Sequence, residues 1–186
     1  LYNEPVCFSF EDGSENKYAD LGNPQRMEEY WDTLKDYAEY IIGIITSIDD
    51  RKPLILMGCP AWDQRIDLPA AKPVEGYDNL MYTVHFYAAT HKDELRSATR
   101  AAIDSGLPVF ISECAACEAT GDGPMDMESW EAWNKLAEDN GVSMIVWSLS
   151  DKDETCSMLT KEASSEGPWA NAHIKEWGRI AKNWIK

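Results

Sequence analysis

The sequence of 186 residues lacks long hydrophobic runs: no stretch comes near the ~18 consecutive apolar residues of a membrane-spanning helix. It does not open with basic residues followed by an apolar stretch, so no signal peptide is visible. Positive charge is scarce too, with 17 Lys and Arg residues against 33 Asp and Glu residues and a formal net charge of −16. Because phosphate-rich surfaces repel such a protein, we expect neither nucleic acid nor a membrane among its partners.

Metal-binding patterns are also sparse. The chain has three histidines, and the Cys114-x-x-Cys117 pair has no second Cys-x-x-Cys with which to complete a structural zinc site. That pair follows a predicted strand, whereas a thioredoxin-like motif should open a helix. We therefore expect no zinc site. The five cysteines are an odd number, so they cannot all pair within one chain, and mostly free thiols are expected.

Aromatic residues, in contrast, are plentiful: eight Trp, eight Tyr and four Phe contribute to a hydrophobic fraction of 44%. This is the composition of a globular protein, and the length suits one domain with a sizeable core. We therefore treat residues 1–186 as a single domain. Aromatic side chains in a very acidic protein suit a neutral sugar better than a polyanion.

Helical and strand patterns alternate along the chain. An apolar stripe at spacings of three and four predicts a long helix, capped by Asn23. Short, nearly continuous apolar runs are typical of strands in a parallel sheet covered by helices. The pattern predicts helices over 24–48, 91–105, 127–139 and 169–185, and strands over 54–58, 80–88, 108–113 and 143–150. This order predicts an α/β fold with parallel strands.

The long connections of this predicted fold gather at one edge. The connections 59–79, 114–125 and 151–168 leave the carboxyl ends of strands, and the connection 5–23 follows Asn3-Glu4-Pro5. In a (β/α) barrel, this edge of the sheet carries the active site. We therefore expect the functional residues there.

Two carboxylates stand out at this edge. Asn3-Glu4-Pro5 alone is most often a turn, since Pro5 fixes its own φ and pushes Glu4 toward extended conformations. Glu113, however, ends an apolar strand, where a carboxylate is costly to hold without a partner. A pair of such carboxylates suits glycoside hydrolysis, in which one acts as acid and base and the other as nucleophile or base.

Four short motifs occur along the chain in the same order as in a known enzyme family. The chain carries NEP, VHFYAATH, PVFISE and VWSLSDKDET, and it resembles the C-terminal part of the family 5 glycoside hydrolases, the clan A cellulases. The resemblance covers nearly the whole chain and corresponds to strands four to eight of the family's eight-stranded barrel. It implies a partial, half-like (β/α)8 TIM barrel with outer helices. It also implies retaining hydrolysis of β-1,4-glucosidic bonds in cellulose or related β-glucans, with no metal and no cofactor.

The resemblance implies a role for each matching residue. Glu4 matches the general acid/base and Glu113 the nucleophile. Asn3 matches the residue that hydrogen-bonds the 2-hydroxyl of the sugar. His85 and Tyr87 match the pair that positions the two carboxylates, although a buried histidine alone is more often part of a core.

Four further residues are implied to contact a β-glucan or cello-oligosaccharide substrate. Trp147 matches the platform under the sugar at the cleavage point, and Trp62 an aromatic on the leaving-group side. Lys152 and Glu154 match a polar pair on the non-reducing side. The structural alternatives are core packing for the two tryptophans and a solvated turn for the charged run 151–154. The two remaining histidines are interpreted as surface residues.

The chain is shorter than the family's domain. A complete barrel needs eight βα units and typically about 250 residues, and nothing here matches strands one to three. The chain could be a fragment, a short form that self-associates as a homodimer or larger assembly, or a rearranged fold. A half barrel would expose sheet edges and apolar surface, so we expect self-association to complete it.

The missing strands leave an alternative to an active enzyme. The chain would then be a catalytically weak or inactive half barrel that binds glucan or needs a partner half. The family resemblance also implies an extracellular or cell-surface location.

Overall fold

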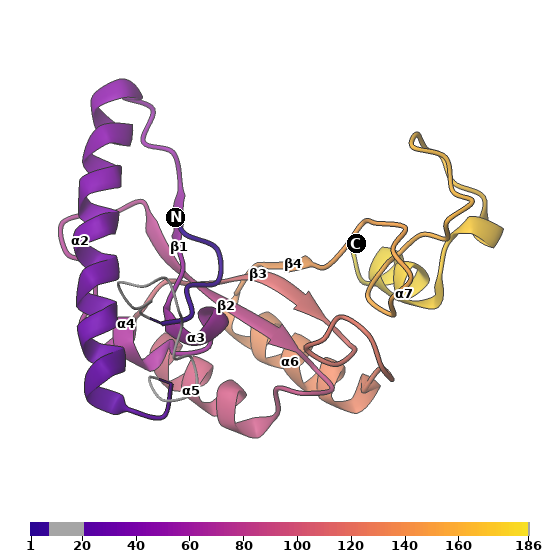
Figure 1. The fold of residues 1–186 in the computed structure, drawn as a ribbon, viewed down its shortest axis with the longest axis horizontal. Coiled ribbons are helices and arrows are strands. Elements are labelled where there is room, and N and C mark those ends of the chain that lie inside the picture. Colours follow the sequence, from indigo (N-terminus) through magenta and orange to yellow (C-terminus); the bar gives the residue numbers. More distant parts are fainter. Residues whose placement is uncertain (8–20, 186) are drawn as a thin grey trace, which may run out of the picture. The chain divides into compact units, whose positions relative to one another are not determined.

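The computed structural model describes residues 1–7 and 21–185, so most of the predicted connection 5–23 lies outside the described residues (Figure 1). The chain divides into two compact units. The first comprises Leu1–His85 and Ser97–Phe110, and the second Phe86–Arg96 and Ile111–Lys186. Two strands, β2 and β3, contribute residues to both units.

The first unit contains the long helix α2 (Pro24–Ile48), whose bounds confirm the prediction. The side chain of Asn23 accepts a hydrogen bond from the backbone N–H of Arg26 and caps the helix. The buried face runs from Met27 to Ile42, and it leaves Ile48 80% exposed. The last turn of the helix is therefore not part of the core.

Two short helices in the same unit were not predicted. Strand β1 (Ile55–Met57) is shorter than the predicted strand 54–58, and α3 (Pro60–Asp63) and α4 (Asp67–Ala71) occupy part of the predicted connection 59–79. Both helices contact α2. At four and five residues, they are too short to show the helical periodicity by which the sequence reveals longer helices.

Strand β2 (Leu80–Tyr87) is the long central strand, and every one of its side chains except that of Met81 is buried. It pairs with β1 in parallel, with Ile55 opposite Leu80. On its other side, the Tyr82 N–H donates to the carbonyl of Pro108, just before β3 (Val109–Ala115). Helix α5 (Asp93–Asp104) connects the two strands.

In the second unit, β3 pairs in parallel with β4 (Met144–Val146), and the register shifts between Ile111 and Cys114. Strand β4 is much shorter than the predicted strand 143–150. The sheet order is β1-β2-β3-β4, and each of the two pairs with a described register is parallel, which confirms the predicted parallel α/β fold.

The helices of the second unit supply an aromatic core. They are α6 (Met127–Asn140), the 3-10 helix η1 (Asn171–His173) and α7 (Glu176–Trp184). Helix α7 begins seven residues after the start of the predicted helix 169–185. Phe86 of β2 stacks on Trp133 of α6 with ring centroids 4.1 Å apart. Trp130 of α6 meets Trp177 of α7 edge to face at 5.0 Å. These rings fix the two helices against the end of β2.

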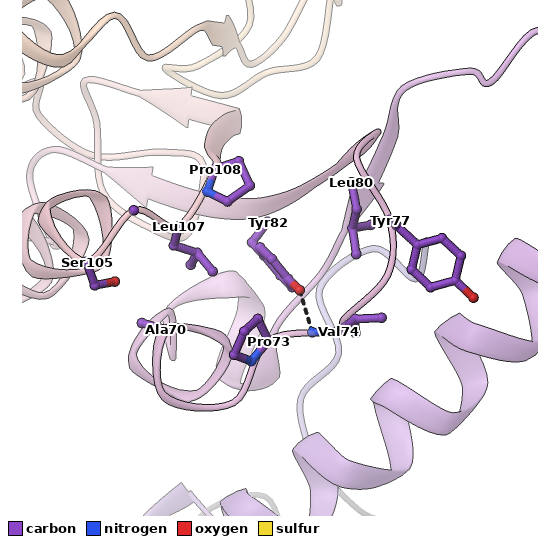
Figure 2. A pocket seen from close by; sticks show the side chains of 10 residues that line it. Ala70, Pro73, Val74, Tyr77, Leu80, Tyr82, Ser105, Leu107 and Pro108 are labelled. Carbon is purple, nitrogen blue, oxygen red and sulfur yellow. Dashed lines mark hydrogen bonds between the residues drawn. The ribbon is translucent and has the colours of Figure 1, made fainter.

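A small cavity lies in the first unit at the amino ends of the strands. It has a volume of about 200 Å³ and is lined by residues that include Leu80, at the start of β2, and Pro108, just before β3 (Figure 2). Within it, the Tyr82 hydroxyl accepts a hydrogen bond from the N–H of Val74 at 2.7 Å. His85, near the other end of β2 in the same unit, is not among the residues that line this cavity.

All five cysteines are free thiols, as predicted, and four of them are buried. Burial raises the pKa of the Cys59 and Cys114 thiols well above the ordinary value, so both remain uncharged. Among the described residues, no helix has both the length and the apolar character that a membrane crossing requires.

Candidate active site

The first unit holds Glu4 through the segment before it. The amino group of Leu1 donates to the carbonyl of Leu56, and the Gly58 N–H donates to the carbonyl of Leu1 at 3.1 Å. Residues 1 and 2 therefore lie alongside β1 without forming a strand of their own. Tyr2 and Glu4 have φ angles of 58° and 48°, which are left-handed rather than extended.

His85 lies between two carboxylates of the first unit. Its Nδ1 atom is 3.0 Å from Oε1 of Glu4, and its Nε2 atom is 3.5 Å from Oδ2 of Asp63. The ring is only 3% exposed, whereas the Glu4 side chain is 30% exposed. The buried ring can thus hold one oxygen of Glu4 while the carboxylate stays open to solvent.

Asp63 itself is 1% exposed and has several hydrogen-bond donors around it. Its Oδ1 atom accepts from the Cys59 N–H at 2.6 Å and from the Thr83 hydroxyl at 2.8 Å, and its Oδ2 atom accepts from the Glu4 N–H at 3.1 Å. Burial raises the pKa of Asp63, while the charge of His85 and the hydrogen bond from Thr83 act in the opposite direction.

The second unit positions the other proposed carboxylate. The Tyr87 hydroxyl donates to Oε1 of Glu113 at 2.7 Å, and Glu113 is buried. Glu113 lies within β3, which continues to Ala115, so the prediction that it ends its strand was wrong. The Tyr87 N–H donates to Nδ1 of His91 at 2.9 Å. His91 is half-buried.

The two tryptophans expected to contact substrate are not core residues. Trp147 directly follows β4 and is 41% exposed. Its N–H donates to the carbonyl of Cys114 at 2.8 Å, and its carbonyl accepts from the indole of Trp177 at 2.6 Å. Trp62, in the first unit, is half-buried, and its N–H donates to the carbonyl of Pro5 at 3.2 Å. A tryptophan whose backbone is held by hydrogen bonds and whose ring is partly exposed suits stacking against a sugar.

The charged run after β4 is only partly a solvated turn. Lys152 is exposed, and its Nζ atom is 3.7 Å from Oε1 of Glu154. The Glu154 side chain is only 20% exposed, and the Cys156 thiol donates to the same oxygen at 3.3 Å. Glu154 also lines an open cavity of about 530 Å³. A hydrogen bond between Cys117 and Cys156 lowers the pKa of the Cys117 thiol.

The structure thus brings the expected residues together in two groups. Glu4 meets His85 in the first unit, and Tyr87 meets Glu113 in the second. Asn3 is exposed beside Glu4. The sequence interpretation missed Asp63, although it directly follows Trp62.

Comparison with known proteins gives a family match. Residues 1–153 match the family model described as cellulase, glycosyl hydrolase family 5. Endoglucanase A of Butyrivibrio fibrisolvens is 35% identical over 164 residues, which cover 88% of this chain and 37% of that protein. Endoglucanase Z of Dickeya dadantii is 32% identical and is matched over 87% of this chain and 38% of its own length.

Solved structures match the fold as well. A structure from Cytophaga hutchinsonii superposes with a TM-score of 0.81 at 31% identity, covering 98% of this chain and 53% of that one. The catalytic domain of Thermobifida fusca endoglucanase Cel5A gives a TM-score of 0.75 at 30% identity, over 82% of this chain and 52% of its own. The chain therefore spans about half the length of these barrel structures, and less than half of the two endoglucanases above.

Proposed function

The chain belongs to glycosyl hydrolase family 5, and from that membership we propose that it hydrolyses β-1,4-glucosidic bonds in cellulose or a related β-glucan. The main support is the pairing of each expected carboxylate with its expected partner. His85 contacts Glu4, and Tyr87 donates to Glu113. Successive side chains of a strand point to opposite faces, so His85 and Tyr87 lie on the same face of β2.

The proposed mechanism is a double displacement that retains the anomeric configuration. In the first step, Glu4 gives its proton to the glycosidic oxygen while a carboxylate oxygen of Glu113 attacks the anomeric carbon. The bond to the leaving sugar breaks, and an ester bond to Glu113 forms. In the second step, Glu4 takes a proton from a water molecule whose oxygen attacks the same carbon and releases Glu113.

The two carboxylates are held in ways that suit these roles. Glu113 is buried and receives the Tyr87 hydroxyl, which fixes the oxygen of a nucleophile. Glu4 is partly exposed, as a group that exchanges protons with the leaving sugar and with water must be. We propose a separation of about 5–5.5 Å between the two carboxyl groups, the spacing of retaining enzymes. The reaction needs two carboxyl groups and water, and no metal or cofactor takes part in it.

We assign substrate contacts to the five remaining site residues. The rings of Trp62 and Trp147 are accessible and attached to hydrogen-bonded backbone, which suits stacking against sugar faces. Asn3, next to Glu4, is placed to meet a sugar hydroxyl. Lys152 and Glu154 offer a donor and an acceptor 3.7 Å apart for hydroxyls further along the chain of sugars. A β-glucan polymer is too large to enter a cell, so we propose an extracellular or cell-surface location.

We further propose that the chain corresponds to strands four to eight of the family barrel and that self-association completes it. Several large apolar side chains support an additional contact surface, because they are exposed in the described structure. Tyr2 is 55% exposed, Ile145 52%, and Leu149 and Ile185 64% each. Apolar surface of this kind marks contact sites when it is contiguous.

The test of the function is hydrolysis of carboxymethylcellulose at high protein concentration. The wild type should release reducing ends, and Glu113→Gln and Glu4→Gln should each lower the rate by about 10²-fold or more, since each removes a chemical step. NMR of fresh products should show the β anomer first. Equal rates for the wild type and Glu113→Gln would reject the proposal, and binding of cello-oligosaccharides without turnover would point to a glucan-binding remnant.

A further inference from the structure

Asp63 lies where three segments that carry proposed site residues meet. One oxygen, Oδ1, is anchored by the Cys59 N–H and the Thr83 hydroxyl. The other, Oδ2, faces the Glu4 N–H at 3.1 Å and Nε2 of His85 at 3.5 Å. One carboxylate thus contacts the segment before α3, the strand β2 and the backbone of Glu4.

The backbone conformation of residues 61–63 and the lack of a side chain at Gly58 place the Asp63 carboxylate in this position. Ala61, Trp62 and Asp63 have φ angles of 58°, 55° and 60°, a left-handed conformation that costs about 1–3 kcal/mol at a residue with a side chain. Gly58 leaves room for the close approach, because a Cβ atom at this position would lie 2.8 Å from Oδ1 of Asp63. A buried carboxylate is itself costly unless hydrogen bonds satisfy it, and here three donors do so.

We propose that Asp63 is a positioning residue for the proposed acid/base, a role that rests on the function proposed above. Its Oδ2 atom fixes the backbone of Glu4 and, at the same time, favours a proton on Nε2 of His85. Asp63 would not touch the substrate and would act only through these two residues.

The proton on Nε2 determines which hydrogen bond Nδ1 of His85 can form with Glu4 during the catalytic cycle. When His85 is neutral, its Nδ1 atom carries no proton and can accept one in a hydrogen bond from protonated Glu4. When Glu4 has given its proton to the leaving sugar, Nδ1 can take a proton from solvent, and the cationic ring then pairs with the carboxylate. The ring returns this proton to solvent when Glu4 takes a proton from the attacking water. The buried ring thus holds Oε1 of Glu4 in place in both states, without turning over.

The variant that tests this is Asp63→Asn. The Asn oxygen can keep the hydrogen bonds from Cys59 and Thr83, which places its NH2 group toward His85 and the Glu4 N–H. A donor facing Nε2 moves the ring proton to Nδ1, as the equivalent substitution does in the serine protease triad. The Glu4 N–H loses its acceptor. The fold is expected to persist because the side chains have the same shape.

NMR with 15N-labelled histidine reads out the tautomer directly, and the chain has only three histidines to assign. We expect a proton on Nε2 of His85 in the wild type and on Nδ1 in Asp63→Asn, with an upfield shift of the Glu4 amide proton. The matched control is Asp67→Asn, because Asp67 is half-exposed and pairs with Arg65 at the surface. It should leave both signals unchanged.

Hydrolysis gives the second readout. Asp63→Asn should lower kcat by about 10²-fold with little change in KM, since a misplaced acid weakens the chemical step rather than binding. Thr83→Val keeps the carboxylate but removes one of its anchors, and it should shift the same NMR signals less. This milder variant keeps the test decisive if Asp63→Asn does not fold.

The outcomes separate the two proposals. A neutral His85 without a proton on Nε2 in the wild type, or unchanged His85 and Glu4 signals in a folded Asp63→Asn, would overturn the role of Asp63 whatever the activity. Absence of hydrolysis by the wild type, with the expected NMR changes in Asp63→Asn, would overturn the proposed function but leave the positioning of Glu4 by Asp63 intact.

Discussion

At the scale of single residues, strand β2 provides partners for both proposed catalytic carboxylates. His85 contacts Glu4, and Tyr87 contacts Glu113, from two positions of one strand. The two contacts differ in burial, since the Tyr87 contact is buried and the Glu4 side chain is partly exposed. This difference suits a fixed nucleophile and an acid that exchanges its proton.

The Tyr87 contact yields a direct prediction. Tyr87→Phe removes the donor to a buried carboxylate and keeps the ring, so it should lower the free energy of unfolding by about 1–3 kcal/mol. The rate of hydrolysis should also fall, because Glu113 loses the group that orients it. Urea unfolding measures the stability. Tyr40→Phe, at an exposed position of α2, is the control and should change neither quantity.

Asp63 yields a prediction on pH. Burial raises the pKa of Asp63, so the native state holds this proton more tightly than the unfolded chain does. The free energy of unfolding therefore falls as pH rises from the unfolded pKa, about 3.9, through the higher folded pKa. Asp63→Asn lacks this group. The stability of the wild type relative to Asp63→Asn should be greater at about pH 4 than at about pH 7.

Urea unfolding of both proteins at the two pH values measures this difference. A relative stability that grew with pH would show that the pKa of Asp63 is lowered in the native state, so that its hydrogen bonds outweigh its burial.

The residues that the sequence revealed are those with a local pattern. Glu4 and Glu113 stand in short motifs, and His85 and Tyr87 alternate along an apolar strand. Asp63 was missed because its contacts reach Glu4, 59 positions away in the chain, and depend on three left-handed residues that no periodicity announces.

At the scale of elements, backbone hydrogen bonds explain where the predicted bounds succeeded and failed. Helix α2 begins where predicted, because Asn23 caps it and Pro24 fits its first turn. The predicted helix 169–185 starts only at Glu176, because residues just before it pair with a distant segment of the chain. The Lys175 N–H donates to the carbonyl of Met158, and Leu159 bridges to Ile174. Such long-range pairing leaves no trace in the local sequence.

Helix α2 offers a stabilising change. Gly43 lies inside the helix, and a Cβ atom added there would have no neighbour within 4 Å. Gly43→Ala should raise the free energy of unfolding by about 0.5–1 kcal/mol, because alanine loses less backbone freedom on helix formation. Thermal or urea unfolding measures it.

Gly58→Ala is the matched contrast. An added Cβ atom there would collide with the carbonyl of Tyr2 and approach Asp63. The variant should be less stable than the wild type, and the segment that carries Glu4 should lose protection from hydrogen exchange. Similar effects of the two substitutions would mean that residues 1–4 are not held against β1.

At the scale of the whole molecule, the match to family 5 covers about half of each solved relative. If self-association completes the barrel, the interface should bury on the order of 2,000 Å² or more, as obligate dimers do. Size-exclusion chromatography with light scattering should then give at least a dimer. Dilution should lower activity and stability together. A monomer that stays folded and active on dilution would contradict this expectation.

In the proposed mechanism, Glu113 forms a bond to the sugar, and Glu4 supplies a proton in the first step and removes one in the second. The most direct measurement is trapping of the covalent intermediate with a 2-fluoro cellobioside that carries a good leaving group, followed by mass spectrometry of the digested protein. We expect a cellobiosyl adduct on the peptide that contains Glu113, and none in Glu113→Gln. An adduct on another residue, or hydrolysis of β-glucan with no adduct, would contradict it.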